Sequence, residues 1–255
     1  MDKKIIKNIQ AKINLQNKNQ IIPYNIFQTF KYRNVPISMY KNAIIWNKLN
    51  PEYNYYFYDD NDMNEYLNSY DFKDFCYDKN TFFKAFNKIK PGAGKADLFR
   101  LVIIYDKGGC YFDIDTTCIK PLSSFIRSND EVVTGLGGQK DFHQWGLIYK
   151  KRHPFIKKTL EIAIYNIIKE NFINNICKLE FLCGPPCLDL GIKKVLNLNK
   201  EYKFKSGKQI INGISFRILE RDYFNNNVGF KYKEYKNDLN KLDVKYWGYD
   251  DIFNK

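Results

Sequence analysis

The 255-residue sequence lacks any apolar run near the ~20 residues that a membrane-spanning helix requires. Its opening, MDKKIIKN, is charged and is not followed by the apolar core of a signal peptide. These absences predict a protein with no signal peptide and no transmembrane anchor. We expect it in the cytoplasm, or peripheral at a membrane surface.

Histidine is scarce, and the cysteines are not arranged as metal ligands. The chain has two histidines, and its six cysteines form no CxxC pair. Cys183-Gly-Pro-Pro-Cys187 is too loosely organised for a zinc knuckle. We therefore expect no zinc site and reduced thiols, which agrees with a cytoplasmic setting. His153 precedes a proline where a helix is expected to begin, so a capping role is favoured over a catalytic one.

Acidic residues are outnumbered, with 28 Asp and Glu against 41 Lys and Arg, and the formal net charge is +13. Such a charge suits a polyanionic partner such as nucleic acid. However, the positive charge is mostly lysine spread along the whole chain. Because the charge is spread in this way, a nucleic-acid partner is not expected. A diphosphate, an acidic acceptor or a lipid surface would also be attracted to a basic surface.

The length favours one α/β domain, with residues 1–20 as a lead-in and 21–255 as the domain. Residues 21–30 predict a strand, 38–49 a helix capped by Ser38, and 53–58 a second strand. This order implies a parallel crossover whose ligands lie at the carboxyl ends of the strands. Further strands are expected over 131–134, 145–149, 209–219 and 228–235, and further helices over 153–170 and 187–198.

The segment from Lys95 to Asp115 carries the strongest pattern. Apolar residues recur at helical spacing until Gly108-Gly109, where a left-handed cap would end the helix. A strand over 110–115 follows and would point Asp113 and Asp115 to the same side. Two adjacent carboxylates repel each other, and a divalent cation bound through oxygen relieves that repulsion.

The helix of this segment carries a second pair. Asp97 and Arg100 lie one turn apart on one face, close enough for a salt bridge. Taken separately, this pair and the Asp-Ile-Asp sequence also fit a surface ion pair and a polar strand end. Their order and spacing together are much more specific.

The combined pattern, Ala-Asp-Leu-Phe-Arg followed by Gly-Gly-x-Tyr-x-Asp-x-Asp, resembles the DXD region of glycosyltransferase family 32. That family holds yeast-type α-mannosyltransferases, α-1,4-galactosyltransferases and capsular-sugar transferases. The region also resembles the glucosyltransferase domains of large clostridial toxins. The resemblance implies a GT-A fold, a single Rossmann-like α/β domain with a mostly parallel sheet flanked by helices. Its donor-binding part would span 21–122 and its acceptor side 123–255.

The implied activity is retaining, metal-dependent transfer of a hexose from a UDP- or GDP-sugar to a glycan, lipid or protein acceptor. The resemblance implies that Asp115 binds Mn²⁺ or Mg²⁺ directly and that Asp113 holds the donor ribose and completes the metal shell. It places Tyr111 against the nucleotide. It gives Asp97 the sugar hydroxyls and Arg100 the sugar or diphosphate. These four charged residues form the expected catalytic set.

The segment Ile22-Pro-Tyr-Asn-Ile-Phe-Gln-Thr-Phe30 resembles the family's opening "Ile-Pro-x-x-Ile-His-Gln-Thr-Trp", with Phe27 in place of the histidine and Phe30 in place of the tryptophan. The resemblance implies donor contacts from Phe27, Gln28 and Phe30. Phe30 would be the nucleobase platform, although a buried strand-end aromatic fits its position equally well. Gln144 is the nearest match to an amide that contacts the donor sugar.

Family members commonly end with a histidine near a tryptophan. Trp247 is present, but no histidine follows residue 153, so Asp250 or Asp251 is the candidate substitute ligand. The missing histidine keeps a non-catalytic sugar-nucleotide or glycan-binding module open as an alternative. A less favoured alternative is a two-carboxylate metal-dependent nuclease or phosphotransferase.

Overall fold

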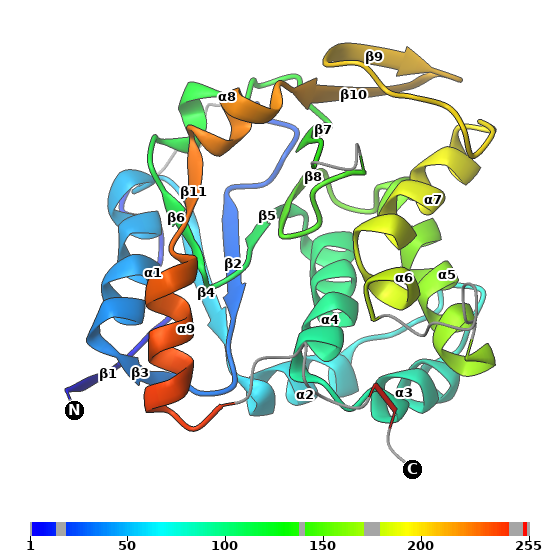
Figure 1. Cartoon of the computed structure of the whole chain (residues 1–255). Helices are drawn as coiled ribbons and strands as arrows, with labels where there is room; N and C mark the ends of the chain where they lie inside the picture. Colours follow the sequence, from blue (N-terminus) through cyan, green and yellow to red (C-terminus); the bar gives the residue numbers. More distant parts are fainter. Residues whose placement is uncertain (1, 14–18, 138–140, 171–178, 245–251, 254–255) are drawn as a thin grey trace.

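A computed structural model describes residues 2–13, 19–137, 141–170, 179–244 and 252–253, with Tyr232 described by its backbone alone. Its centre is a seven-stranded sheet (Figure 1). In spatial order the strands are β4 (Asn54–Tyr58), β2 (Asn25–Thr29), β5 (Gly109–Phe112), β8 (Gly146–Tyr149), β7 (Val132–Gly135), β10 (Ile214–Leu219) and β9 (Gly207–Ile211).

The strand directions follow from the pairing of neighbours. β4, β2 and β5 are mutually parallel, as are β7 and β10, whereas β8 runs antiparallel to both β5 and β7. β9 is antiparallel to β10. In this sheet β8 and β9 therefore oppose the other five strands, and the predicted α/β fold with a mostly parallel sheet is confirmed.

Helices cover both faces of the sheet (Figure 1). α1 (Ile37–Leu49) and α9 (Tyr232–Lys241) lie side by side on one face, and α4 (Gly92–Lys107) and α5 (Pro154–Lys169) cover the other. Strand side chains alternate between two cores: Cys110 and Phe112 belong to the α1 side, and Tyr111 to the α4 side. The remaining elements are β1 (Lys3–Ile5), β3 (Asn34–Pro36), α2 (Asp60–Ser69), α3 (Lys79–Lys88), β6 (Thr116–Cys118), η1 (Leu122–Ser124), α6 (Leu179–Cys183), α7 (Pro185–Val195), α8 (Arg221–Asn225) and β11 (Val228–Phe230).

The first crossover is as predicted, since β2 and β4 pair in parallel on either side of α1. The prediction that Ser38 caps α1 is wrong. The helix begins at Ile37 after Pro36, and Ser38 lies inside it. The Ser38 hydroxyl lies 2.7 and 2.8 Å from the two carboxylate oxygens of Asp238 on α9. Its role is therefore to join two helices.

The helix that ends at Gly108-Gly109 is confirmed, with φ of 64° and 111° at the two glycines. The predicted strand over 110–115 is wrong at its end, because β5 stops at Phe112. The carbonyl of Asp113 accepts hydrogen bonds from the Thr116 amide at 3.0 Å and the Thr116 hydroxyl at 2.6 Å, which closes a turn. Strand alternation therefore does not orient the two carboxylates.

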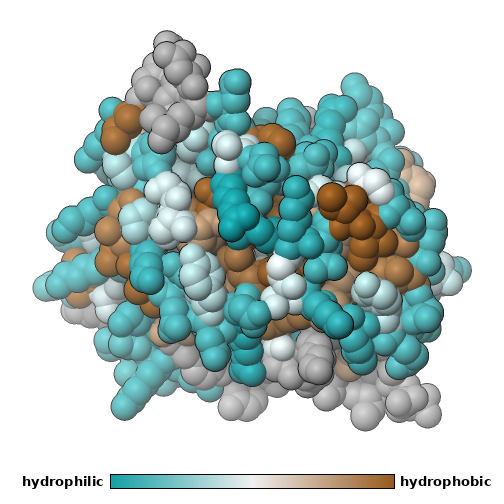
Figure 2. Space-filling model, turned by 90° about the horizontal axis from the view of Figure 1, so that it is seen from above, coloured by the Kyte–Doolittle hydropathy of each residue, from teal (hydrophilic) through white to brown (hydrophobic). Residues whose placement is uncertain are grey.

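The last third of the chain departs from expectation in one place. β11 ends at Phe230 and α9 begins at Tyr232, so the strand predicted over 228–235 is half helix. By contrast, His153 caps α5 as predicted, its Nδ1 accepting the Phe155 amide at 3.2 Å. Seen from above, the surface is mostly hydrophilic with scattered apolar patches (Figure 2).

Two further predictions concern cysteines and membranes. The described cysteines, at positions 76, 110, 118, 183 and 187, form no disulfide, and Cys177 lies outside the described residues. Among the described helices, none combines the length and the apolar character needed to cross a bilayer.

Candidate functional site

Arg100 forms ion pairs with two of the predicted acidic residues, Asp97 and Asp113, at the carboxyl end of β5. Its Nη2 lies 3.0 Å from Asp97 Oδ1 and 2.7 Å from Asp113 Oδ1. Its Nη1 donates to the Gln144 carbonyl at 3.0 Å, and the residue is only 6% exposed. One buried guanidinium thus joins α4, the turn after β5 and the segment before β8. The predicted salt bridge between Asp97 and Arg100 is confirmed.

Burial and neighbouring charges shift the pKa values of the ionisable groups in this site. Burial raises the pKa of Asp97 to about 6, although the Arg100 charge opposes this shift. Burial also raises the pKa of Asp113, again against Arg100. Burial and then the charge of Asp113 raise the pKa of Asp115 to about 7. Burial would lower the pKa of Arg100, but the charges of Asp113 and Asp97 outweigh it and raise this pKa. The site therefore holds more negative charge than one guanidinium balances.

This donor set fits a hard divalent cation. Among the described residues the Asp115 carboxylate makes no ion pair, and its pKa is raised first by burial and then by repulsion from Asp113. The described part of the chain contains no group of three or more His, Cys, Asp or Glu side chains that could hold a metal. Carboxylate oxygens from two residues, completed by phosphates and water, are the environment in which Mg²⁺ is usually bound.

Gln28 and Tyr111, which lie on β2 and β5, contact the turn after β5 and the Arg100 guanidinium. Gln28 is fully buried; its Nε2 donates to the Asp113 carbonyl at 3.1 Å, and its Oε1 accepts from the Tyr55 hydroxyl at 2.8 Å. The Tyr111 ring centre lies 4.9 Å from the Arg100 guanidinium carbon. Both residues therefore hold the turn and the guanidinium in place.

The other predicted donor contacts lie in packed positions. Phe27 is 1% exposed and stacks on Tyr56 with ring centres 5.4 Å apart. Phe30 is 8% exposed and meets Tyr235 edge-on at 6.4 Å. Gln144 is fully buried and its Nε2 donates to the Cys183 carbonyl at 2.6 Å. Its Oε1 is buried with no hydrogen-bond partner among the described residues.

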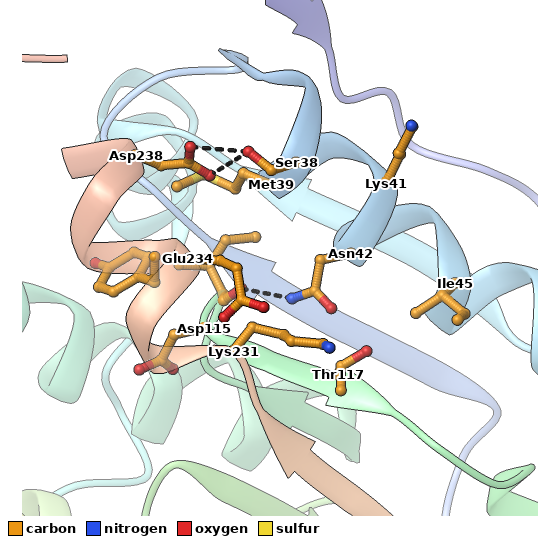
Figure 3. Close-up of a pocket in the computed structure, with 12 residues that line it drawn as sticks. Ser38, Met39, Lys41, Asn42, Ile45, Asp115, Thr117, Lys231, Glu234 and Asp238 are labelled. Atoms are coloured by element: carbon orange, nitrogen blue, oxygen red, sulfur yellow. Dashed lines mark hydrogen bonds between the residues drawn. The ribbon is translucent and has the colours of Figure 1, made fainter. Parts of the chain in front are cut away.

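A cavity of about 280 Å³ opens between α1 and α9 and reaches Asp115 (Figure 3). Met39, Ile114 and Tyr235 supply apolar walls. The Ser38–Asp238 hydrogen bonds close one end (Figure 3). The cavity thus reaches the turn over residues 113–116, called here the acidic turn, and much of its wall is apolar.

Three contacts to the acidic turn could not be expected from the sequence. The Lys231 amide donates to the Asp115 carbonyl at 2.7 Å, just after β11 pairs with β6. Asn42 Nδ2 on α1 donates to the carbonyls of Thr116 at 2.6 Å and Ile114 at 3.2 Å. These partners lie far away in the chain, and no local pattern marks them. Trp247, Asp250 and Asp251 lie outside the described residues.

Comparison with known proteins shows which families contain a similar sequence. Residues 38–133 match the family described as "Glycosyltransferase sugar-binding region containing DXD motif". The initiation-specific alpha-1,6-mannosyltransferase of Candida albicans is 26% identical over 159 residues, 57% of this chain and 40% of that protein. The inositol phosphoceramide mannosyltransferase 3 of Schizosaccharomyces pombe is 27% identical over 113 residues, 43% of this chain and 29% of that protein. The chain therefore spans less than half the length of either relative.

Among solved structures, the PaToxG glycosyltransferase superposes with a TM-score of 0.53 over 70% of each chain, at 22% identity. This likeness agrees with the predicted GT-A fold. Asp97, Arg100, Asp113 and Asp115 all lie inside the matched segment. The chain thus carries the glycosyltransferase sugar-binding region with its DXD motif, and the resemblance to the DXD-containing transferases of family 32 is confirmed.

Proposed function

We propose that this protein is a retaining glycosyltransferase that moves a hexose from a UDP- or GDP-sugar to an acceptor with the help of Mn²⁺ or Mg²⁺. The observation that carries the proposal is the Arg100 bridge between Asp97 and Asp113 beside Asp115, inside the matched sugar-binding region. The alpha linkage in the name of the Candida relative agrees with retention if the donor is an α-linked sugar nucleotide.

Asp113 and Asp115 would hold the cation, because their oxygens suit a hard ion and their mutual repulsion favours one. When bound, such an ion neutralises the charge that develops on a leaving nucleoside diphosphate. The limited number of protein ligands leaves room for phosphate oxygens. Metal and donor would then bind together.

Asp97 and Arg100 would act on the sugar side. The Arg100 charge opposes protonation of Asp97, and this favours a carboxylate that accepts hydrogen bonds from sugar hydroxyls. Arg100 is itself fixed by Gln144 and stacked on Tyr111, so the group is preorganised before substrate binds.

The cavity between α1 and α9 suits the nucleoside half of the donor. Its volume of about 280 Å³ is near the lower end of ligand pockets, roughly 300 Å³, so it would take part of the donor only. The apolar side chains Met39, Ile45, Ile114 and Tyr235 suit a base, and the polar side chains of the lining, such as Asn42 and Thr117, could bind its ribose. Since Asp115 lines the same cavity, a nucleoside there would bring its diphosphate to the acidic turn.

The test combines binding with turnover. Wild-type protein and Asp115→Asn are screened by thermal shift and donor hydrolysis against UDP- and GDP-sugars, with and without Mn²⁺. Asp71→Asn is the control, because that side chain is 67% exposed and pairs only with Lys73 among the described residues. We expect a metal-dependent shift and hydrolysis in wild type and control, and a loss of about 10²-fold or more in hydrolysis for Asp115→Asn.

Each other outcome has a meaning. Metal-dependent binding of a sugar nucleotide without hydrolysis or transfer would identify a non-catalytic binding module. No binding of any sugar nucleotide by the wild type would refute the proposal.

A further inference from the structure

Two aromatic side chains that do not line the cavity belong to the segments hydrogen-bonded to the acidic turn. Trp145 and Phe230 meet edge to face with ring centres 4.5 Å apart. The Trp145 carbonyl accepts a hydrogen bond from the Asp113 amide at 2.9 Å. Lys231, the residue after Phe230, donates its amide to the Asp115 carbonyl at 2.7 Å. The pair is therefore tied by backbone hydrogen bonds to the turn that carries both carboxylates.

Both side chains of the pair reach solvent. Phe230 is 46% exposed, and Trp145 is partly exposed. The Trp145 indole N–H has no acceptor among the described residues. Behind it, Phe224 and His143 pack against the indole ring at 5.3 and 4.6 Å between ring centres, so its position is fixed.

The arrangement separates this pair from the proposed nucleoside cavity. Lys231 and Asp115 line the cavity, whereas neither Trp145 nor Phe230 does. The aromatic pair therefore lies outside the cavity but is hydrogen-bonded through its backbone to the turn that the cavity reaches. A donor whose nucleoside fills the cavity and whose diphosphate lies at Asp115 would bring its sugar to the turn to which both aromatic segments are hydrogen-bonded.

We propose that Trp145 and Phe230 form the platform for the acceptor, and that the acceptor presents a hexopyranose ring. This inference rests on the proposed function. A pyranose has a face of C–H groups that packs on an aromatic ring, and its hydroxyls can accept from the indole N–H. A peptide side chain or a lipid chain offers no such combination of a flat apolar face and ring hydroxyls.

The test uses Phe230→Ser, Trp145→Leu and the conservative Trp145→Tyr and Phe230→Tyr. The control is Tyr165→Ser, which removes a 49% exposed aromatic from α5. Binding of methyl α-D-mannopyranoside and methyl β-D-galactopyranoside is followed by ligand-observed NMR. Transfer and donor hydrolysis are measured in parallel with oligosaccharides ending in these sugars.

We expect Phe230→Ser and Trp145→Leu to raise the acceptor KM, or the saccharide Kd, by about tenfold or more. The ratio of transfer to donor hydrolysis falls with it, and the tyrosine variants recover most of the loss. A general folding defect would instead lower hydrolysis and transfer together. Phe230→Ser, at an exposed position, keeps the test valid if Trp145→Leu fails to fold.

The outcomes separate this inference from the proposed function. Absence of both donor hydrolysis and transfer in the wild type contradicts the proposed function, whereas pyranoside binding that depends on Phe230 still supports the platform. Transfer or binding that is unchanged in both Phe230→Ser and Trp145→Leu overturns the platform. A wild type that binds no pyranoside and transfers only to peptide or lipid acceptors also overturns it.

Discussion

At the scale of single residues, Arg100 is the side chain on which the site depends. It is 6% exposed and satisfies two carboxylates and one carbonyl with its two terminal nitrogens. A planar guanidinium presents several donors in a fixed geometry, whereas an ammonium is a point charge. The site therefore requires arginine in particular.

Arg100→Lys keeps the charge but cannot reach Asp97, Asp113 and the Gln144 carbonyl together. We expect the free energy of unfolding to fall by about 1–3 kcal/mol, because buried acceptors lose their partner. Donor hydrolysis should fall by about 10²-fold. Urea denaturation and hydrolysis assays measure the two effects.

The matched control is Arg152→Lys, since Arg152 is 58% exposed and its ion pair with Asp74 spans 3.3 Å. An exposed pair of this kind contributes little, and we expect a change within about 0.5 kcal/mol. Equal effects of the two substitutions would contradict the role given to Arg100.

At the scale of elements, the start of α5 shows how a capped helix becomes pH-sensitive. His153 is fully buried and caps the helix through Nδ1, so the neutral ring carries its proton on Nε2. Burial lowers the pKa of His153 to about 3, and the charge of Lys150 adds to this shift. Protonation therefore opposes the folded state.

The sign of the pH dependence follows from that shift. The unfolded chain takes up the proton near pH 6.5, whereas the folded chain resists it down to about pH 3. Stability should thus fall as the pH decreases from about 6.5, by at most about 1.4 kcal/mol per unit from this residue.

His153→Asn can cap the helix but cannot be protonated. Denaturation curves at several pH values should show a shallower loss of stability on acidification for the variant than for the wild type. His143, whose pKa burial lowers to about 4, contributes equally to both proteins and cancels in the comparison. Parallel curves for the two proteins would exclude His153 as the source.

At the scale of the whole molecule, the helices over the α4 face pack in close contact at Gly191. A Cβ on Gly191 in α7 would lie 2.3 Å from Thr159 Oγ1 and 3.0 Å from the Thr159 Cα on α5. Two helix backbones therefore approach closely here. The layer behind Asp97 and Arg100 depends on that approach, because α5 also packs on α4.

Gly191→Ala should lower the free energy of unfolding by about 1–3 kcal/mol, since added volume in a packed core forces backbone shifts. Gly92→Ala is the control. A Cβ there meets nothing within 4 Å, and alanine favours the helix that starts at this residue. In thermal melts we expect a lower Tm for Gly191→Ala and a higher Tm for Gly92→Ala than for the wild type. An unchanged Tm for Gly191→Ala would show that the helices can relax around the added methyl group.

Much of the site could be predicted because it is local. Helical spacing places Asp97 one turn before Arg100, and the two glycines after α4 end the helix at a position that a left-handed cap requires. The β2–α1–β4 crossover follows from the same short-range patterns. The predicted cap of α1 is wrong because Ser38 hydrogen-bonds Asp238, which lies 200 positions away in the chain. The predicted end of β5 is wrong because a local turn between Asp113 and Thr116 stops the strand.

The sequence by itself determined the donor helix, its end and the order of the acidic residues, since backbone periodicity and glycine conformations act over a few residues. Tertiary structure alone decided what surrounds them. Gln28 reaches Asp113 across 85 positions, and Asn42 reaches Thr116 across 74. Such contacts depend on how the sheet brings distant strands together, and no pattern in one segment encodes the position of another.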